Sequence, residues 1–134
     1  MWLVSAYYES IRQEREDWRA SKVETCMVCG WGSCGRSGWG QFKWLETHEI
    51  ERRSRAAGRW ANPCNYLLVC NVCHAGPLAA MPHKRQLAYK LAADAEDFDL
   101  VGWLRIRDPD LRAPKRVTME EIRDELEGIS DASG

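Results

Sequence analysis

The stretch 62-NPCNYLLVCNVCH-74 decides how this chain folds. Its apolar run "YLLV" is compatible with a short buried strand, and Cys70 and Cys73 follow it at C-x2-C spacing. A second pair at the same spacing, Cys26 and Cys29, lies upstream, with 40 residues between the pairs. Thiolates at this spacing direct both sulfurs toward one point, and two pairs complete the tetrahedral shell that Zn²⁺ prefers. We therefore predict a structural zinc site formed by these four cysteines.

The chain has 134 residues, which is enough for one hydrophobic core. We treat residues 1–134 as a single domain with an N-terminal helix in 1–25, a core in 26–94 and an acidic C-terminal extension in 95–134. No apolar run approaches the ~18 residues of a membrane span, and the first residues lack the basic leader and cleavage site of a signal peptide. We expect a cytoplasmic protein, whose six cysteines act as metal ligands or buried thiols rather than as disulfides.

Apolar periodicity predicts the elements before the second cysteine pair. Val4, Tyr8, Ile11 and Trp18 recur at three-, four- and seven-residue steps, which indicates an amphipathic helix over residues 5–22. Five glycines in residues 30–40 indicate a tight turn followed by a loop. Residues 41–50 alternate between apolar and polar side chains, and this predicts a strand of about eight residues whose end places neighbouring side chains on opposite faces.

The second half of the chain is predicted to be mainly helical. A polar connection leads to the strand at 66–69, and a helix is expected to begin at residues 70–73 and to continue, with interruptions at Pro77 and Pro82, to about residue 94. Pro109 and Pro114 indicate a loop. Thr118 and Glu121 have the spacing of a capping box, which predicts a last helix. The expected fold class is α+β.

Charge is distributed unevenly along the chain. Residues 36–90 hold nine basic and three acidic side chains, whereas residues 91–134 hold six basic and twelve acidic ones. The middle segment indicates a polyanion-binding surface. We expect the acidic segment to form a second layer over the core; a cover for the basic surface and a dock for a protein partner are the alternatives. The predicted phosphate contacts are Arg52, Arg53, Arg55, Arg59, Lys84 and Arg85.

Residues 26 to about 85 resemble the HNH endonuclease family. The matching pieces are "CMVCG" at 26–30, "THEI" at 47–50 and "CNYLLVCNVCH" at 64–74. Many phage-encoded HNH proteins share this layout. The resemblance implies a ββα-metal (His-Me finger) core with a zinc knuckle, flanked by helices. It implies a metal-dependent enzyme that hydrolyses DNA phosphodiester bonds with Mg²⁺, Mn²⁺ or another divalent cation. The alternative function is a zinc-stabilised nucleic-acid-binding module without cleavage activity.

The resemblance also implies roles for individual residues. His74 matches the last histidine of the family motif, a ligand of the catalytic cation, and Asn65 matches the asparagine that holds the loop and orients the base. The first motif departs from the family pattern. In one register His48 is a cation ligand and Glu49 the general base; in the other His48 is the base and Thr47 stands at the ligand position. We favour the first register, because an isoleucine then occupies the expected apolar position.

Two cysteines and four tryptophans complete the candidates. Cys34 and Cys64 belong to neither pair, and we interpret them as small buried or partly exposed residues, with Cys34 as an alternative zinc ligand. Tryptophan rings can stack on nucleobases, but we expect most of them to be core residues. The tryptophans concerned are Trp31, Trp39, Trp44 and Trp60.

Overall fold

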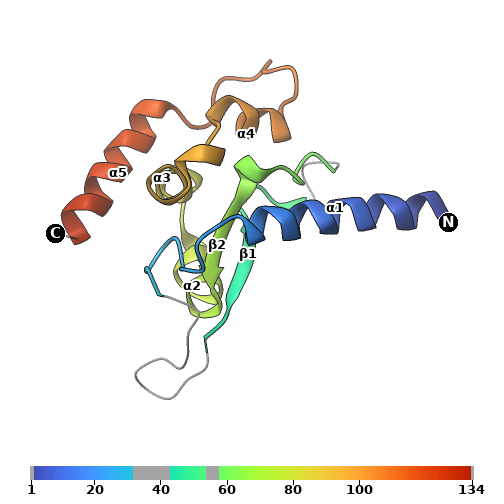
Figure 1. The fold of residues 1–134 in the computed structure, drawn as a ribbon. Helices are drawn as coiled ribbons and strands as arrows, with labels where there is room; N and C mark the ends of the chain where they lie inside the picture. Colours follow the sequence, from blue (N-terminus) through green and yellow to red (C-terminus); the bar gives the residue numbers. More distant parts are fainter. Residues whose placement is uncertain (1, 32–42, 54–57, 134) are drawn as a thin grey trace.

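The computed structural model describes residues 2–31, 43–53 and 58–133, and Figure 1 shows their arrangement. Five helices and a two-stranded antiparallel sheet form a small α+β fold in these residues, as predicted. The elements are α1 (Trp2–Ala20), β1 (Leu45–Glu49), β2 (Tyr66–Cys70), α2 (Asn71–Ala75), α3 (His83–Ala93), α4 (Leu100–Arg107) and α5 (Met119–Ser133), with single 3-10 turns at Pro63–Asn65, Pro77–Ala80 and Ala95–Asp97.

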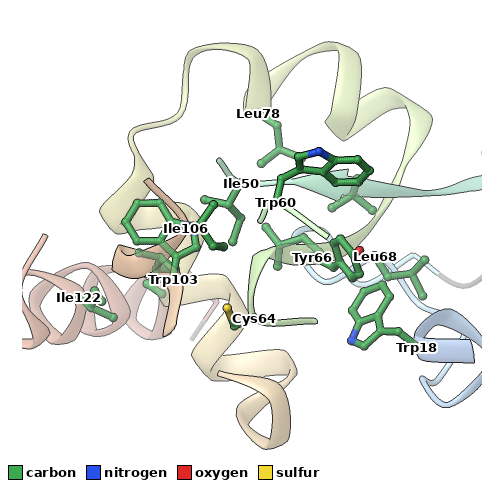
Figure 2. Packing of buried hydrophobic residues seen from close by; sticks show 14 of the residues in the cluster. Trp18, Ile50, Trp60, Cys64, Tyr66, Leu68, Leu78, Trp103, Ile106 and Ile122 are labelled. Atoms are coloured by element: carbon green, nitrogen blue, oxygen red, sulfur yellow. The ribbon is translucent and has the colours of Figure 1, made fainter. Parts of the chain in front are cut away.

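Strand β2 lies at the centre of the core, and all five of its residues are buried. One face of the sheet packs against α1, where the rings of Trp18 and Tyr66 lie 5.3 Å apart in an edge-to-face contact (Figure 2). The other face is covered by α2, which contacts both strands. Because both faces are covered, the strand reads as an uninterrupted apolar run rather than as an alternating one.

Strand β1 is shorter than predicted. It begins at Leu45, which pairs with Cys70, and ends at Glu49, which pairs with Tyr66. The ladder cannot extend toward residue 43, because β2 stops at Cys70 where α2 begins. Trp44 lies outside the strand and is 55% exposed, although its carbonyl still accepts a hydrogen bond from the backbone of Asn71. Residues 41 and 42 lie outside the described part of the chain.

The described residues of the predicted apolar face of α1 differ in burial. Trp18 is buried and Ile11 partly buried, whereas Tyr8 is 63% exposed. In Figure 1 the N-terminal part of α1 extends beyond the sheet, and Tyr8 borders a hollow that Arg53, Gly58 and Trp60 also line. Tyr8 is therefore exposed, although the apolar periodicity groups it with Ile11 and Trp18.

The helix predicted after β2 is interrupted at both prolines, giving α2, a 3-10 turn and α3. The predicted capping box is also present: the backbone N–H of Glu121 donates to Oγ1 of Thr118 (3.2 Å), and the N–H of Thr118 donates to Oε1 of Glu121 (3.2 Å). Helix α5, which this box begins, packs beside α3 (Figure 1). This contact places the acidic C-terminal segment as a second layer over the core.

Helix α4 was not predicted, although its sequence carries the usual signals. Asp99 accepts a hydrogen bond from the backbone of Gly102 (3.0 Å) as an N-cap. Val101 is exposed, whereas Leu100, Trp103, Leu104 and Ile106 lie on one side of the helix and are buried. Among them, Trp103 is completely buried and reaches the loop between the two strands.

A buried ionic cluster joins α1 to α3. The ammonium group of Lys90 is completely buried and donates to the carbonyls of Pro63 and Tyr66 (2.7 Å each) and to the carboxylate of Asp94. Burial lowers the pKa of Lys90, and Asp94 opposes this by accepting its hydrogen bond. Lys22 pairs with the same carboxylate (2.7 Å). The cluster satisfies charges that would otherwise be costly to bury.

None of the described helices combines the length and the apolar content needed to cross a lipid bilayer.

Candidate functional site

The four predicted cysteines converge on one point. Their sulfur atoms all lie within 4.8 Å of one another, and the sulfurs of Cys29 and Cys70 are 3.8 Å apart. Zn–S bonds of about 2.3 Å in a tetrahedron place the sulfurs about 3.8 Å apart, so the four thiols fit a zinc ion. The backbone N–H groups of Cys29 and Cys73 point at the sulfurs of Cys26 and Cys70, as in zinc knuckles. The cluster is therefore consistent with the predicted structural zinc.

The position of this cluster determines where His74 lies. Cys70 is both the last residue of β2 and the N-cap of α2, and its sulfur accepts a hydrogen bond from the backbone of Cys73 (3.4 Å). The other cysteine pair is held against β2 by the N–H of Met27, which donates to the carbonyl of Leu68 (2.8 Å). A zinc ion at the cluster would thus fix the first turn of α2 on the sheet, and His74 is the next residue along that turn.

The remaining cysteine and tryptophan candidates fall in different environments. Cys64 is 4% exposed, and burial raises its pKa to about 12, so it remains a neutral thiol apart from the cluster. Trp31 is partly buried and Trp60 is a core residue, which leaves Trp44 exposed. Cys34 and Trp39 lie outside the described residues.

His48 and His74 meet at a pocket of about 230 Å³. Strand β1 supplies His48 and helix α2 supplies His74, and the two ring centroids are 5.1 Å apart in an edge-to-face arrangement. Side chains alternate across a strand, so Glu46 and His48 share the face of β1 that His74 approaches. The sheet and the first helix after it thereby bring two imidazoles together from positions 26 residues apart in the sequence.

The hydrogen bonds of Gln86 determine the tautomer of His48. The amide nitrogen of Gln86 donates to the carbonyl of Met81 (2.8 Å), so its oxygen faces Nε2 of His48 at 2.7 Å. Nε2 must therefore carry the proton, which leaves the lone pair on Nδ1. Burial lowers the pKa of His48, so the ring is neutral at pH 7 and its Nδ1 can accept a proton or bind a metal.

Glu46 orients His74 in a similar way. Its carboxylate oxygen lies 3.1 Å from Nδ1 of the ring, which must donate, and the lone pair of His74 is therefore on Nε2. Sequence reasoning missed both Glu46 and Gln86. The position of Glu46, two residues before His48 on a predicted strand, was a signal that it shares the face of that histidine. No comparable signal marks Gln86, because it reaches His48 only through the packing of α3.

Glu49 lies on the opposite face of β1. Its carboxylate oxygens pair with Arg15 of α1 (3.7 Å) and with Arg53, and only 15% of its side chain is exposed. The residue also borders the pocket that contains His48. Thr47 shares the face of Glu49, and its carbonyl accepts a hydrogen bond from Arg15 (3.3 Å). Glu49 therefore meets two guanidinium groups rather than His74.

Asn65 is completely buried and uses its whole hydrogen-bonding capacity. Its oxygen accepts from the backbone of Glu51 (2.6 Å) and from the indole of Trp103 (3.1 Å), and its amide nitrogen donates to the carbonyls of Glu51 and Trp60 (3.1 Å each). These bonds fasten both ends of the connection between β1 and β2. Asn65 thus holds the segment that follows His48, and its side chain does not line the pocket.

Replacing Asn65 with alanine is expected to lower the free energy of unfolding by about 3–5 kcal/mol, because two buried donors lose their acceptor. Urea unfolding followed by circular dichroism measures the change. The control is Asn62→Ala, which removes a single capping bond to the backbone of Cys64 (3.0 Å) and should cost about 1 kcal/mol. Equal losses in the two variants would contradict this role of Asn65.

Most of the predicted phosphate contacts are paired within the protein. Arg53 pairs with Glu49 and lies over the ring of Trp60 (4.0 Å), and Arg59 donates to the carbonyl of Ile106 (2.8 Å). Lys84 (3.7 Å) and Arg85 (2.9 Å) both pair with Glu125 of α5. Arg52 is exposed, and Arg55 lies outside the described residues.

A site for a catalytic cation is only partly assembled. Within residues 2–31, 43–53 and 58–133, the four cysteines form the one group of three or more Cys, His, Asp or Glu side chains whose ligand atoms converge. The two imidazoles fit a cation in part, because bonds of about 2.1 Å from each nitrogen are compatible with rings 5.1 Å apart.

Comparisons of this chain with protein-family models, with curated proteins and with solved structures find no match.

Proposed function

We propose that this protein is a metal-dependent DNA endonuclease of the HNH type, built on a ββα-metal core. The observation that carries the proposal is the pair His48 and His74, which meet at one pocket with fixed tautomers and a lone pair on each ring. Two antiparallel strands followed directly by a helix supply both residues. The cysteine cluster at the start of α2 supports the same interpretation, since it positions His74.

The proposed chemistry divides between the two imidazoles. Hydrolysis of a phosphodiester needs a base that takes a proton from water and positive charge near the phosphate oxygens. His74 would hold the cation through Nε2, while Glu46 keeps Nδ1 of that ring protonated. The cation would supply stabilisation of the negative charge on the phosphate and on the leaving 3′ oxygen. Asn65 holds the loop behind His48, which agrees with the role that the family resemblance implies.

The two registers assign the base differently. In the first, His48 is a second cation ligand and Glu49 the base; in the second, His48 is the base. The contacts of Glu49 favour the second register, because its carboxylate is engaged by Arg15 and Arg53 rather than facing His74. The neutral ring of His48, whose Nε2–H is held by a carbonyl oxygen, has the arrangement of a general base.

A nucleic-acid-binding module without cleavage activity is the second candidate. The observation that favours it is the absence, among the described residues, of a third ligand atom that converges with the two imidazoles. Such a protein would bind duplex DNA through the same surface and leave it intact. One HNH core cuts one strand, so the nuclease should first produce nicked circles.

The experiment compares the zinc-loaded wild-type protein with His74→Ala on supercoiled plasmid in Mg²⁺ and Mn²⁺ buffers. We expect nicked circles from the wild-type protein and a loss of at least about 100-fold in the variant. Val72→Ala is the matched control, because Val72 lies on the same helix as His74, is 43% exposed and does not line the pocket. Duplex binding by gel shift without nicking in any metal would favour the binding module instead.

A further inference from the structure

Three hollows adjoin one another along one side of the molecule. The pocket of His48 and His74 shares His83 with a second hollow of about 320 Å³, and the second shares Arg107 and Arg116 with a third of about 460 Å³. The third hollow lies between the end of α4 and residues 108–116, which connect toward α5. We call these three hollows, which are linked by their shared lining residues, the α4 groove.

The α4 groove is lined by positive charge. Arg107 and Lys115 are exposed, and no ion pair or hydrogen bond engages either side chain in the described part of the chain. Arg52 adds charge nearer to the candidate site, whereas Lys84, which also lines the groove, is paired with Glu125 (3.7 Å). Burial lowers the pKa of His83; Glu51 opposes this effect, and Arg116, Arg107 and Arg52 add smaller lowering effects.

The acidic groups of the groove are occupied by donors of the protein. The carboxylate of Asp108 accepts hydrogen bonds from the backbone N–H groups of Arg112 (3.2 Å) and Ala113 (2.9 Å). That of Glu121 belongs to the capping box of α5. These bonds shape the connection after α4, and neither carboxylate forms an ion pair with Arg107 or Lys115 in the described part of the chain.

Arg116 anchors the groove to the candidate site. Its guanidinium pairs with the buried carboxylate of Glu51 (2.9 Å) and lies over the ring of Trp103 (4.8 Å). Glu51 and Trp103 are both hydrogen-bonded to Asn65. The groove therefore has a fixed position relative to His48, and a polyanion lying in it would be directed toward the pocket.

We propose that the α4 groove binds the phosphate backbone of duplex DNA on one side of the phosphate that is cut, with Arg107 and Lys115 as its principal contacts. This rests on the proposed function for the identity of the polyanion. Exposed cations without protein partners are suited to phosphate contacts that position a duplex without reading its sequence. The C-terminal third, acidic in composition, thus contributes the basic binding surface.

The test is the affinity of the full-length, zinc-loaded chain for a labelled duplex of about 20 base pairs, measured by fluorescence anisotropy without a divalent cation, so that no cleavage is needed. The variant Arg107→Ala/Lys115→Ala should bind about ten-fold more weakly, and the slope of log affinity against log salt should fall by about 1.8, or about 0.9 for each lost phosphate contact. The control is Arg105→Ala/Arg123→Ala, which removes the same charge at exposed positions that do not line the groove. It should bind as the wild-type protein does.

Three outcomes separate this proposal from the proposed function. A binding loss specific to the groove variant supports the groove even if the wild-type protein never nicks plasmid, in which case the nuclease assignment alone fails. Equal duplex affinity of the groove and control variants overturns the groove, whether or not the wild-type protein cleaves. The groove variant is also tested against a poly-glutamate peptide. If it binds duplex as the wild-type protein does but loses affinity for this peptide, the proposal is overturned, because the groove would then bind an acidic protein segment.

Discussion

The variant His48→Ala is expected to lose about 10²- to 10⁴-fold in plasmid nicking rate, the range found when a general base is removed, while Glu49→Gln should stay within a few-fold of the wild-type rate. The reason is the environment of the two side chains. His48 lies at the pocket with Nδ1 available and faces His74 at 5.1 Å. Glu49 is committed to Arg15 and Arg53 on the other face of β1. Initial rates on supercoiled plasmid in Mn²⁺ measure the difference.

Two further measurements make this comparison decisive. Thermal unfolding of both variants shows whether either substitution disturbs the fold, since Glu49 also helps to hold α1. Glu46→Gln should reduce the rate by about 10- to 100-fold, as expected for a residue that orients a metal ligand, and should raise the Mn²⁺ concentration needed for half-maximal nicking. A loss of nicking in Glu49→Gln, equal to that in His48→Ala, would restore the register in which Glu49 is the base.

Cys70→Ser is expected to abolish the cooperative unfolding transition and to release the zinc ion. Structural zinc sites contribute about 10–16 kcal/mol of apparent free energy at pH 7, which exceeds the 5–15 kcal/mol by which typical domains are stable. Cys70 has a further role, because it ends β2 and caps α2. Metal content by mass spectrometry and unfolding by circular dichroism measure the two effects.

The matched control is Cys64→Ala. Cys64 is buried, as Cys70 is, yet it lies outside the cluster, so this variant should keep one zinc ion per chain and lose only about 1 kcal/mol. Full zinc content in a folded Cys70→Ser protein would contradict the four-cysteine site.

Local patterns in the sequence were sufficient to predict the elements that contain the site. The two C-x2-C pairs, the apolar run of β2 and the interruptions at Pro77 and Pro82 were all confirmed, because each depends on the spacing or backbone properties of adjacent residues. The capping box of α5 is of the same kind. The cysteine cluster is the part of the predicted metal chemistry that the structure supports.

Features set by tertiary packing were not predictable. The true length of β1 depends on where its partner ends, and the exposure of Tyr8 depends on how far the sheet extends beneath α1. Gln86 reaches His48 only because α3 folds back onto the sheet. The charge of chain segments was misleading for a similar reason, because the pairing of Lys84 and Arg85 with Glu125 appears only when distant segments meet.

The most direct test of the central claim is the dependence of plasmid nicking on an added cation. Wild-type protein carrying one zinc ion per chain is incubated with supercoiled plasmid, first without further metal and then with Mg²⁺ or Mn²⁺. The account predicts intact plasmid in the first condition and accumulation of nicked circles in the second. Folded, zinc-loaded protein that leaves the plasmid intact with every divalent cation would contradict the assignment as a nuclease.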